Sequence, residues 1–198
     1  MDDDRREFLT LLRDACGRFG LKVQAYCLMS NHYHLIAVPK GPDSLHLALK
    51  WVSQLYTQYV NRLHGRSGHL WQDRFFSCAL DDEHFWAAMA YVERNPVRAR
   101  LAREARAYPW SSAAAHCGGA DAWGLVDLAN WRKRLGPLRW EEALADPGNE
   151  KTLASLRLCT SRGRPLGGDK FLAKLEVLLG RRLRPLPRGR PKKAKKAE

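Results

Sequence analysis

The chain has 198 residues and a formal net charge of +13, and 45% of its residues are hydrophobic. No run approaches the roughly twenty apolar residues of a membrane span, and the acidic N-terminus does not resemble a secretory signal. The five cysteines are scattered and lack a Cys-x-x-Cys pair. We therefore expect reduced thiols in a cytoplasmic, nucleoid-associated protein. The positive charge indicates a nucleic-acid partner, but does not distinguish DNA from RNA.

The N-terminal third predicts one helix followed by a β-hairpin. Residues 5–19 place their apolar side chains on one helical face, and Gly20 ends the helix. Residues 22–28 and 34–38 are rich in β-branched and aromatic side chains. Ser30 and Asn31 between them are turn formers, so these two segments predict antiparallel strands.

Two histidines lie at the start of the second predicted strand. His32 and His34 are two positions apart, so on a strand they share one face and lie about 7 Å apart along the backbone. Their imidazoles can converge on one divalent ion, while Tyr33 points to the opposite face and packs. The alternative is a strand whose two histidines are simply hydrogen-bonded or half exposed.

A long helix and a strand are predicted next. Residues 44–63 carry an apolar stripe at helical spacing, which is typical of a helix that packs on the core. After a loop at residues 65–68, residues 70–80 predict a strand. Arg74 and Phe75 on that strand are candidates for contacts with a phosphate and a base, although a packed aromatic is an equal alternative.

The next helix carries a second candidate motif. Acidic residues 81–83 suit a helix start, and Pro96 is expected to end the helix. Tyr91 and Asn95 are four positions apart, so they share one face with about 6 Å of rise between them. A tyrosine there can also be ordinary core, and Asn95 can merely cap the helix before the proline.

Residues 108–180 predict a helical C-terminal region. Trp123, Trp131 and Trp140 are expected to build a small helical core in it. The basic segment 131–134 is a candidate phosphate contact, with a solvated charged face as the alternative. The predicted helices span residues 125–135, 140–144, 150–159 and 168–179.

The final segment, residues 181–198, holds nine Lys or Arg and one Glu, which gives +8 and leaves +5 of the total for the preceding 180 residues. Such a composition predicts a disordered basic tail. Arg188, Gly189, Arg190 and Pro191 resemble an AT-hook, which inserts into the narrow minor groove of A-tract DNA. The alternative is a tail that binds any polyanion by counterion release.

Three motifs in order resemble those of the single-tyrosine HUH transposases, and the REP-associated tyrosine transposases are the nearest branch. The motifs are residues 25–35, 68–75 and 91–99, and the resemblance extends over roughly residues 2–116. It implies an α+β, ferredoxin-like core with an antiparallel sheet over residues 1–107. It also implies a Mg²⁺ or Mn²⁺ ion held by His32, His34 and Asn95, with Tyr91 as the nucleophile.

The function implied by the resemblance is metal-dependent cleavage and rejoining of single-stranded DNA at hairpin-forming repeats, through a covalent 5′-phosphotyrosine. Imidazoles suit several transition metals, so the bound ion is as plausibly Mn²⁺ as Mg²⁺. Arg94 and Arg98 are expected to bind the phosphate backbone, and the family implies a homodimer. One alternative is a domesticated or truncated, non-catalytic DNA-binding protein that acts in regulation or bridging. Another is an RNA-binding accessory protein.

The chain departs from the family at its start. Relatives begin with an extra strand of the Tyr-His-Val type, ahead of an acidic stretch that resembles residues 2–5. That strand would be central in a ferredoxin-like sheet, beside the histidine strand, so its loss would expose backbone groups and apolar surface. A misassigned start codon, a decayed gene copy or replacement by another segment would explain the difference, and the first is favoured. If the chain is complete, both stability and activity are expected to suffer.

Overall fold

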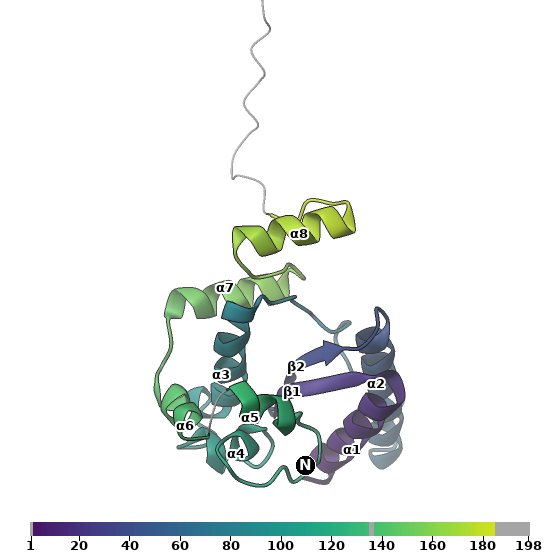
Figure 1. Ribbon diagram of the computed structural model, residues 1–198. Helices are drawn as coiled ribbons and strands as arrows, with labels where there is room; N and C mark the ends of the chain where they lie inside the picture. The colour runs from purple at the N-terminus through teal and green to yellow at the C-terminus, as the bar shows by residue number, and fades with distance from the viewer. Residues whose placement is uncertain (1, 135–136, 185–198) are drawn as a thin grey trace, which may run out of the picture.

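A computed structural model describes residues 2–134 and 137–184 and has an α+β architecture, which confirms the predicted fold class (Figure 1). Within the described residues, none of the helices is long and apolar enough to cross a membrane. The elements in chain order are α1 Asp2–Phe19, β1 Leu21–Leu28, β2 Tyr33–Pro39, α2 Ser44–Leu63, α3 Asp82–Arg98, the 3-10 helix η1 Ala105–Ala107, α4 Ala113–His116, α5 Leu128–Arg134, α6 Pro137–Ala145, α7 Glu150–Ser161 and α8 Asp169–Leu179.

The first helix begins with three aspartates, whose charges complement the positive end of the helix dipole. It ends at Gly20, whose φ of 68° favours glycine. The Gly20 carbonyl accepts a hydrogen bond of 2.9 Å from the backbone N–H of Lys40, just after β2. An added Cβ at Gly20 would lie 3.2 Å from Lys40 Cδ. Gly20 thus lets the end of α1 approach the far end of the hairpin.

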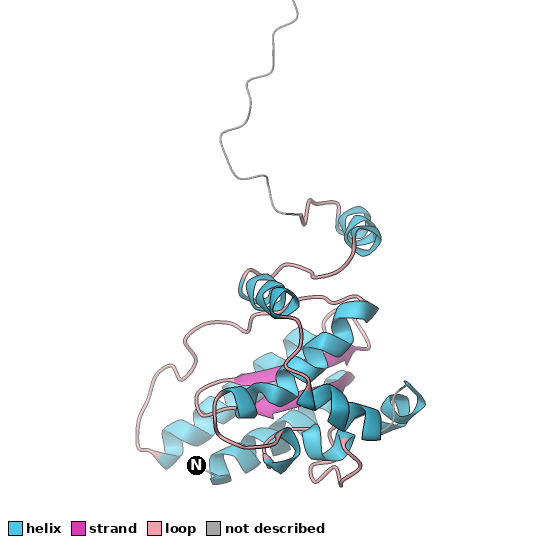
Figure 2. Ribbon diagram, turned by 90° about the vertical axis from the view of Figure 1, so that its left-hand side faces the viewer, coloured by secondary structure: helices cyan, strands magenta, loops and turns pink. Residues whose placement is uncertain are grey.

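The hairpin is antiparallel and places Cys27 opposite His34, with a bulge between Val23 and Ala25. In the part of the chain that the structure describes, β1 and β2 form the whole sheet. Residues 110–112 and 126–127 contact the other edge of β1 and satisfy several of its backbone groups. Helices surround the two strands (Figure 2).

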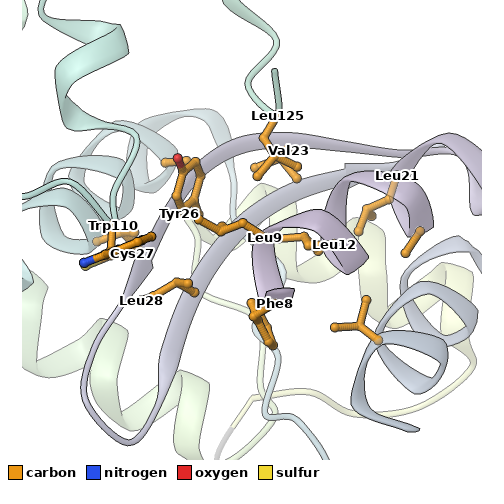
Figure 3. Close-up of a cluster of buried hydrophobic side chains, with 14 of the residues drawn as sticks. Phe8, Leu9, Leu12, Leu21, Val23, Tyr26, Cys27, Leu28, Trp110 and Leu125 are labelled. Carbon is orange, nitrogen blue, oxygen red and sulfur yellow. The ribbon is translucent and has the colours of Figure 1, made fainter. Parts of the chain in front are cut away.

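The buried core joins α1, the hairpin and the later helices. In Figure 1, α3 lies to the left of the hairpin, and α1 and α2 lie to its right. Figure 3 shows α1 and β1 side chains packing together, with Trp110 and Leu125 beside them. Trp131 and Trp140 do not form a separate small core, because they belong to this same cluster and pack against Trp86 of α3, with ring centroids 5.8 and 6.2 Å from it.

Two local predictions were wrong. Residues 70–80 do not form a strand: of these, only Leu80 is in a β-bridge, with Leu166. The aromatic side chains that suggested a strand have no adjacent ladder, and Phe76 is 62% exposed. The second error concerns Pro96, because α3 continues through this residue to Arg98. The helix starts where predicted, and Asp81 caps it by accepting from the backbone N–H of His84.

The C-terminal helices lie close to their predicted positions. The start of α8 is tied to α3, since Asp81 also accepts a hydrogen bond of 2.8 Å from the backbone N–H of Gly168. Beyond α8, Arg184 forms an ion pair of 2.6 Å with Glu176. The rest of the predicted basic tail, residues 185–198 with the AT-hook-like Arg188, Gly189, Arg190 and Pro191, lies outside the described residues.

A buried carboxylate links α3 to the C-terminal region. Glu93 is fully buried, and its Oε1 lies 2.6 Å from Nδ1 of His116 and accepts from the hydroxyl of Ser112. Its Oε2 accepts a hydrogen bond of 2.7 Å from the indole N–H of Trp140. Ser112 also accepts from the backbone N–H of Tyr26 in β1. These bonds hold α3 at a fixed position against the sheet and against α4 and α6, because a buried charge is stable only with its partners in place.

Candidate functional site

The two histidines of the hairpin lie beside each other. The rings of His32 and His34 are perpendicular, with centroids 4.9 Å apart, and Tyr33 between them packs on Phe8 and Trp71. Nδ1 of His32 lies 2.8 Å from Oδ1 of Asn31. Because an amide oxygen only accepts, this bond places the proton on Nδ1 and leaves Nε2 free to bind a cation.

Half-buried His34 is neutral near neutral pH. Burial, with smaller contributions from the neighbouring His32 and Arg98, lowers the pKa of His34 to about 4. A neutral imidazole has a lone pair for a metal ion without first losing a proton.

The lowered pKa of His34 predicts how the stability of the metal-free protein depends on pH. Between pH 6.5 and about 4 the unfolded chain binds a proton at His34 and the folded chain does not, so the free energy of unfolding should fall as the pH falls through this window. The loss attributable to His34 is at most about 3–4 kcal/mol, at about 1.4 kcal/mol for each pH unit. Urea denaturation of the wild type and His34→Gln at several pH values measures it: the variant should lack this loss. His46→Gln, at an exposed position on α2, is the control. If the free energy of unfolding depends on pH in the same way for the wild type and for His34→Gln, the prediction is contradicted.

The tyrosine of the second motif lies next to this histidine pair. The ring of Tyr91 is half-buried, with its centroid 5.7 Å from that of His34. α3 contacts both strands of the hairpin, which brings the two motifs together across 57 residues of sequence. The histidines and the phenol therefore line one site, and are not on separate sides of the molecule.

Asn95 is buried, and its side-chain amide forms hydrogen bonds with backbone carbonyls of α3. Its Nδ2 donates to the carbonyl of Tyr91 at 2.9 Å and to that of Val92 at 3.4 Å. Pro96 has no N–H to offer to the Val92 carbonyl, so the Asn95 side chain supplies the missing donor, which explains why α3 continues past the proline. The amide oxygen lies 3.4 Å from the guanidinium of Arg98. The metal-ligand role of Asn95 stays a prediction.

Two guanidinium groups lie near the phenol. That of Arg98 lies 4.9 Å from the ring centroid of Tyr91, and that of Arg157 from α7 lies 5.6 Å from it. Arg94, one turn after Tyr91, has a lowered pKa because it is partly buried, and Arg98 acts in the same direction against the opposing effect of Asp146. The site is therefore positively charged and suited to an anion.

Sequence reasoning missed two residues of this region. Arg157 lies 66 positions after Tyr91 and has no local motif to mark it. Glu93 did carry a signal: it lies four positions after Met89 on the apolar face of the helix, where a charged side chain needs buried partners. Arg74, predicted to contact DNA, is exposed in the loop before α3.

The donor set fits an open metal site with two protein ligands. His32 has a free Nε2, and His34 is neutral. Among the described residues, no group of three His, Cys, Asp or Glu side chains could hold a metal ion. Further oxygen ligands would have to come from Asn95, water or a bound phosphate, as in catalytic sites that keep open positions for a substrate.

Comparison with known proteins gives one family. Residues 1–95 match the family described as "Transposase IS200 like", a range that contains both histidines, Tyr91 and Asn95. Comparisons with the curated proteins and with the solved structures give no match.

Proposed function

Residues 1–95 match the IS200-like transposase family, and we propose on that ground that this chain is a DNA-processing protein of the transposase type. From that premise, we propose that it cleaves and rejoins single-stranded DNA through Tyr91, at hairpin-forming repeats. The observation that carries the proposal is the approach of the Tyr91 ring to His34 of the histidine pair, beside the guanidinium groups of Arg98 and Arg157.

In the proposed reaction the hydroxyl oxygen of Tyr91 attacks a DNA phosphorus. The bond from this oxygen to phosphorus forms, the bond from phosphorus to the 3′ oxygen breaks, and the phenol loses its proton. The 3′ oxygen leaves and takes up a proton, so the products are a 5′-phosphotyrosine and a free 3′-OH. A 3′-OH of another strand can reverse the step, because the new bond is again a phosphodiester. No nucleotide cofactor is needed.

The protein contributes charge and position to this step. His32 and His34 would hold a Mg²⁺ or Mn²⁺ ion, which when bound neutralises developing negative charge on the phosphate. Arg94 and Arg98 are proposed to bind the phosphate backbone beside the nucleophile. Guanidinium groups suit this role, since their fork of N–H donors matches phosphate oxygens.

The direct test is to incubate the protein with hairpin-bearing single strands and Mn²⁺ and to look for a protein–DNA adduct that survives denaturation. An adduct supports the proposal. DNA binding without any adduct, across hairpins of varied sequence and with either metal, would favour a non-catalytic DNA-binding protein.

Loss of a histidine ligand should be partly rescued by metal. His32→Ala or His34→Ala is expected to lower the rate of adduct formation by about 100-fold at low metal concentration, since even the loss of a group that hydrogen-bonds to a metal ligand typically costs about 10–100-fold in metal affinity or activity. Extra Mn²⁺ should restore part of the rate, because mass action fills a weakened site. His46→Ala is the control. A loss that does not respond to metal would argue against the ligand role.

A further inference from the structure

The C-terminal helix α7 supplies a charged residue to the Tyr91 site, although it lies beyond the residues that match the family. α7 lies against α3 (Figure 1). The guanidinium of Arg157 is 5.6 Å from the Tyr91 ring centroid. Hydrogen bonds with Glu150 and with the side chain of Tyr91 raise the pKa of Arg157. Arg157 thus reaches the phenol, the group that is proposed to react.

The second observation is that Arg157 and Arg98 approach the same ring. Arg98 comes from the last turn of α3 and lies 4.9 Å from the ring centroid. Both guanidinium groups bring positive charge to the ring of the proposed nucleophile, and this charge favours an anion at the phenol. A single negatively charged phosphate has several oxygens with which to accept from both guanidinium groups.

The present partner of Arg157 is weakly held. Glu150 accepts a hydrogen bond of 2.9 Å from it, but the Glu150 side chain is 76% exposed, and exposed ion pairs contribute little to stability. The Arg157 guanidinium can therefore exchange this carboxylate for a phosphate at small cost, while it stays beside Tyr91.

We propose that Arg157 is a substrate-binding residue of the Tyr91 site and that, with Arg98, it binds the DNA phosphate that Tyr91 attacks. This inference rests on the proposed function. It makes the C-terminal helical region a part of the reactive site. As the oxygen–phosphorus bond to Tyr91 forms, negative charge on the phosphate oxygens is stabilised by the N–H groups of Arg157.

The test compares single-turnover rates of adduct formation for Arg157→Gln, Arg157→Lys and the wild type. Removing one such donor is expected to lower the rate about 10²–10³-fold in Arg157→Gln. The rate for Arg157→Lys should lie between those of Arg157→Gln and the wild type, because lysine keeps the positive charge but lacks the forked N–H donors of the guanidinium group. Arg162→Gln, an exposed arginine at the end of the same helix, is the matched control and should react at the wild-type rate. Glu150→Gln should leave the rate unchanged or raise it.

The outcomes separate this inference from the proposed function. If the wild type forms the adduct and Arg157→Gln forms it equally fast, the inference is overturned and the proposed function stands. If the wild type forms no adduct, the proposed function fails, and the salt dependence of single-stranded DNA binding then decides about Arg157. Loss of one phosphate contact should reduce the slope of log affinity against log salt by about 0.7 in Arg157→Gln and not in Arg162→Gln. Equal slopes would overturn the inference.

Discussion

Tyr91→Phe is expected to abolish the covalent protein–DNA adduct. The substitution removes only the hydroxyl oxygen, and the ring that contacts His34, Arg98 and Arg157 stays in place. Removing a catalytic nucleophile typically costs many orders of magnitude in rate, so we expect a loss of at least about 10⁴-fold. Gel electrophoresis under denaturing conditions measures the adduct, and fluorescence anisotropy measures DNA binding, which should stay close to that of the wild type.

Tyr59→Phe is the matched control for this substitution. Tyr59 lies on α2 and stacks on Tyr56, with ring centroids 6.1 Å apart, so it loses the same atom in an aromatic environment. Its adduct should form as in the wild type. Adduct formation that persists undiminished in Tyr91→Phe would reject Tyr91 as the nucleophile, whatever else the protein does with DNA.

Glu93→Ala is expected to destabilise the fold by about 3–5 kcal/mol, the range for breaking a buried, hydrogen-bonded charge pair. The change leaves Trp140, Ser112 and His116 without the acceptor that they share. For a chain of this length, about 1 kcal/mol lowers the melting temperature by about 2–4 °C, so we expect a fall of roughly 10 °C. Thermal unfolding followed by circular dichroism measures it.

The effect of Glu93 should depend on burial and not on charge alone. Glu83→Ala removes an exposed carboxylate from the first turn of the same helix and should cost at most about 1 kcal/mol. Glu93→Gln keeps the shape and one acceptor and is expected to lie between the two. Equal melting temperatures for Glu93→Ala and Glu83→Ala would mean that the buried network does not stabilise the protein.

The amino-acid sequence predicted the helices and the β-hairpin, but it gave a wrong strand at residues 70–80. Apolar spacing and end signals located α1 and α2, because both are local properties of the chain. The segment at residues 70–80 looked like a strand because of its aromatic residues, but strand formation depends on a partner, and only Leu80 has one. The continuation of α3 past Pro96 depends on one side-chain donor, that of Asn95, which helical spacing does not reveal.

The candidate site was also predicted in part from the sequence. The spacing of His32 and His34 predicted two imidazoles side by side, and their rings do lie together. The approach of Tyr91 to them followed from the family resemblance, because residues 57 positions apart carry no local sign of contact. Arg157 had neither signal: its place beside the phenol depends on how α7 packs against α3.

The burial of Glu93 also bears on how this protein could be shortened. The match to the IS200-like family ends at residue 95, yet the three side chains that bind Glu93 all come later in the chain. A fragment that ends at residue 95 would retain every predicted metal ligand and Tyr91. In this fragment, however, the carboxylate of Glu93 would lose its hydrogen-bond partners Ser112, His116 and Trp140 and would be exposed to solvent. The border of sequence similarity is therefore not a border of autonomous folding, and minimal versions of the protein should extend at least through Trp140.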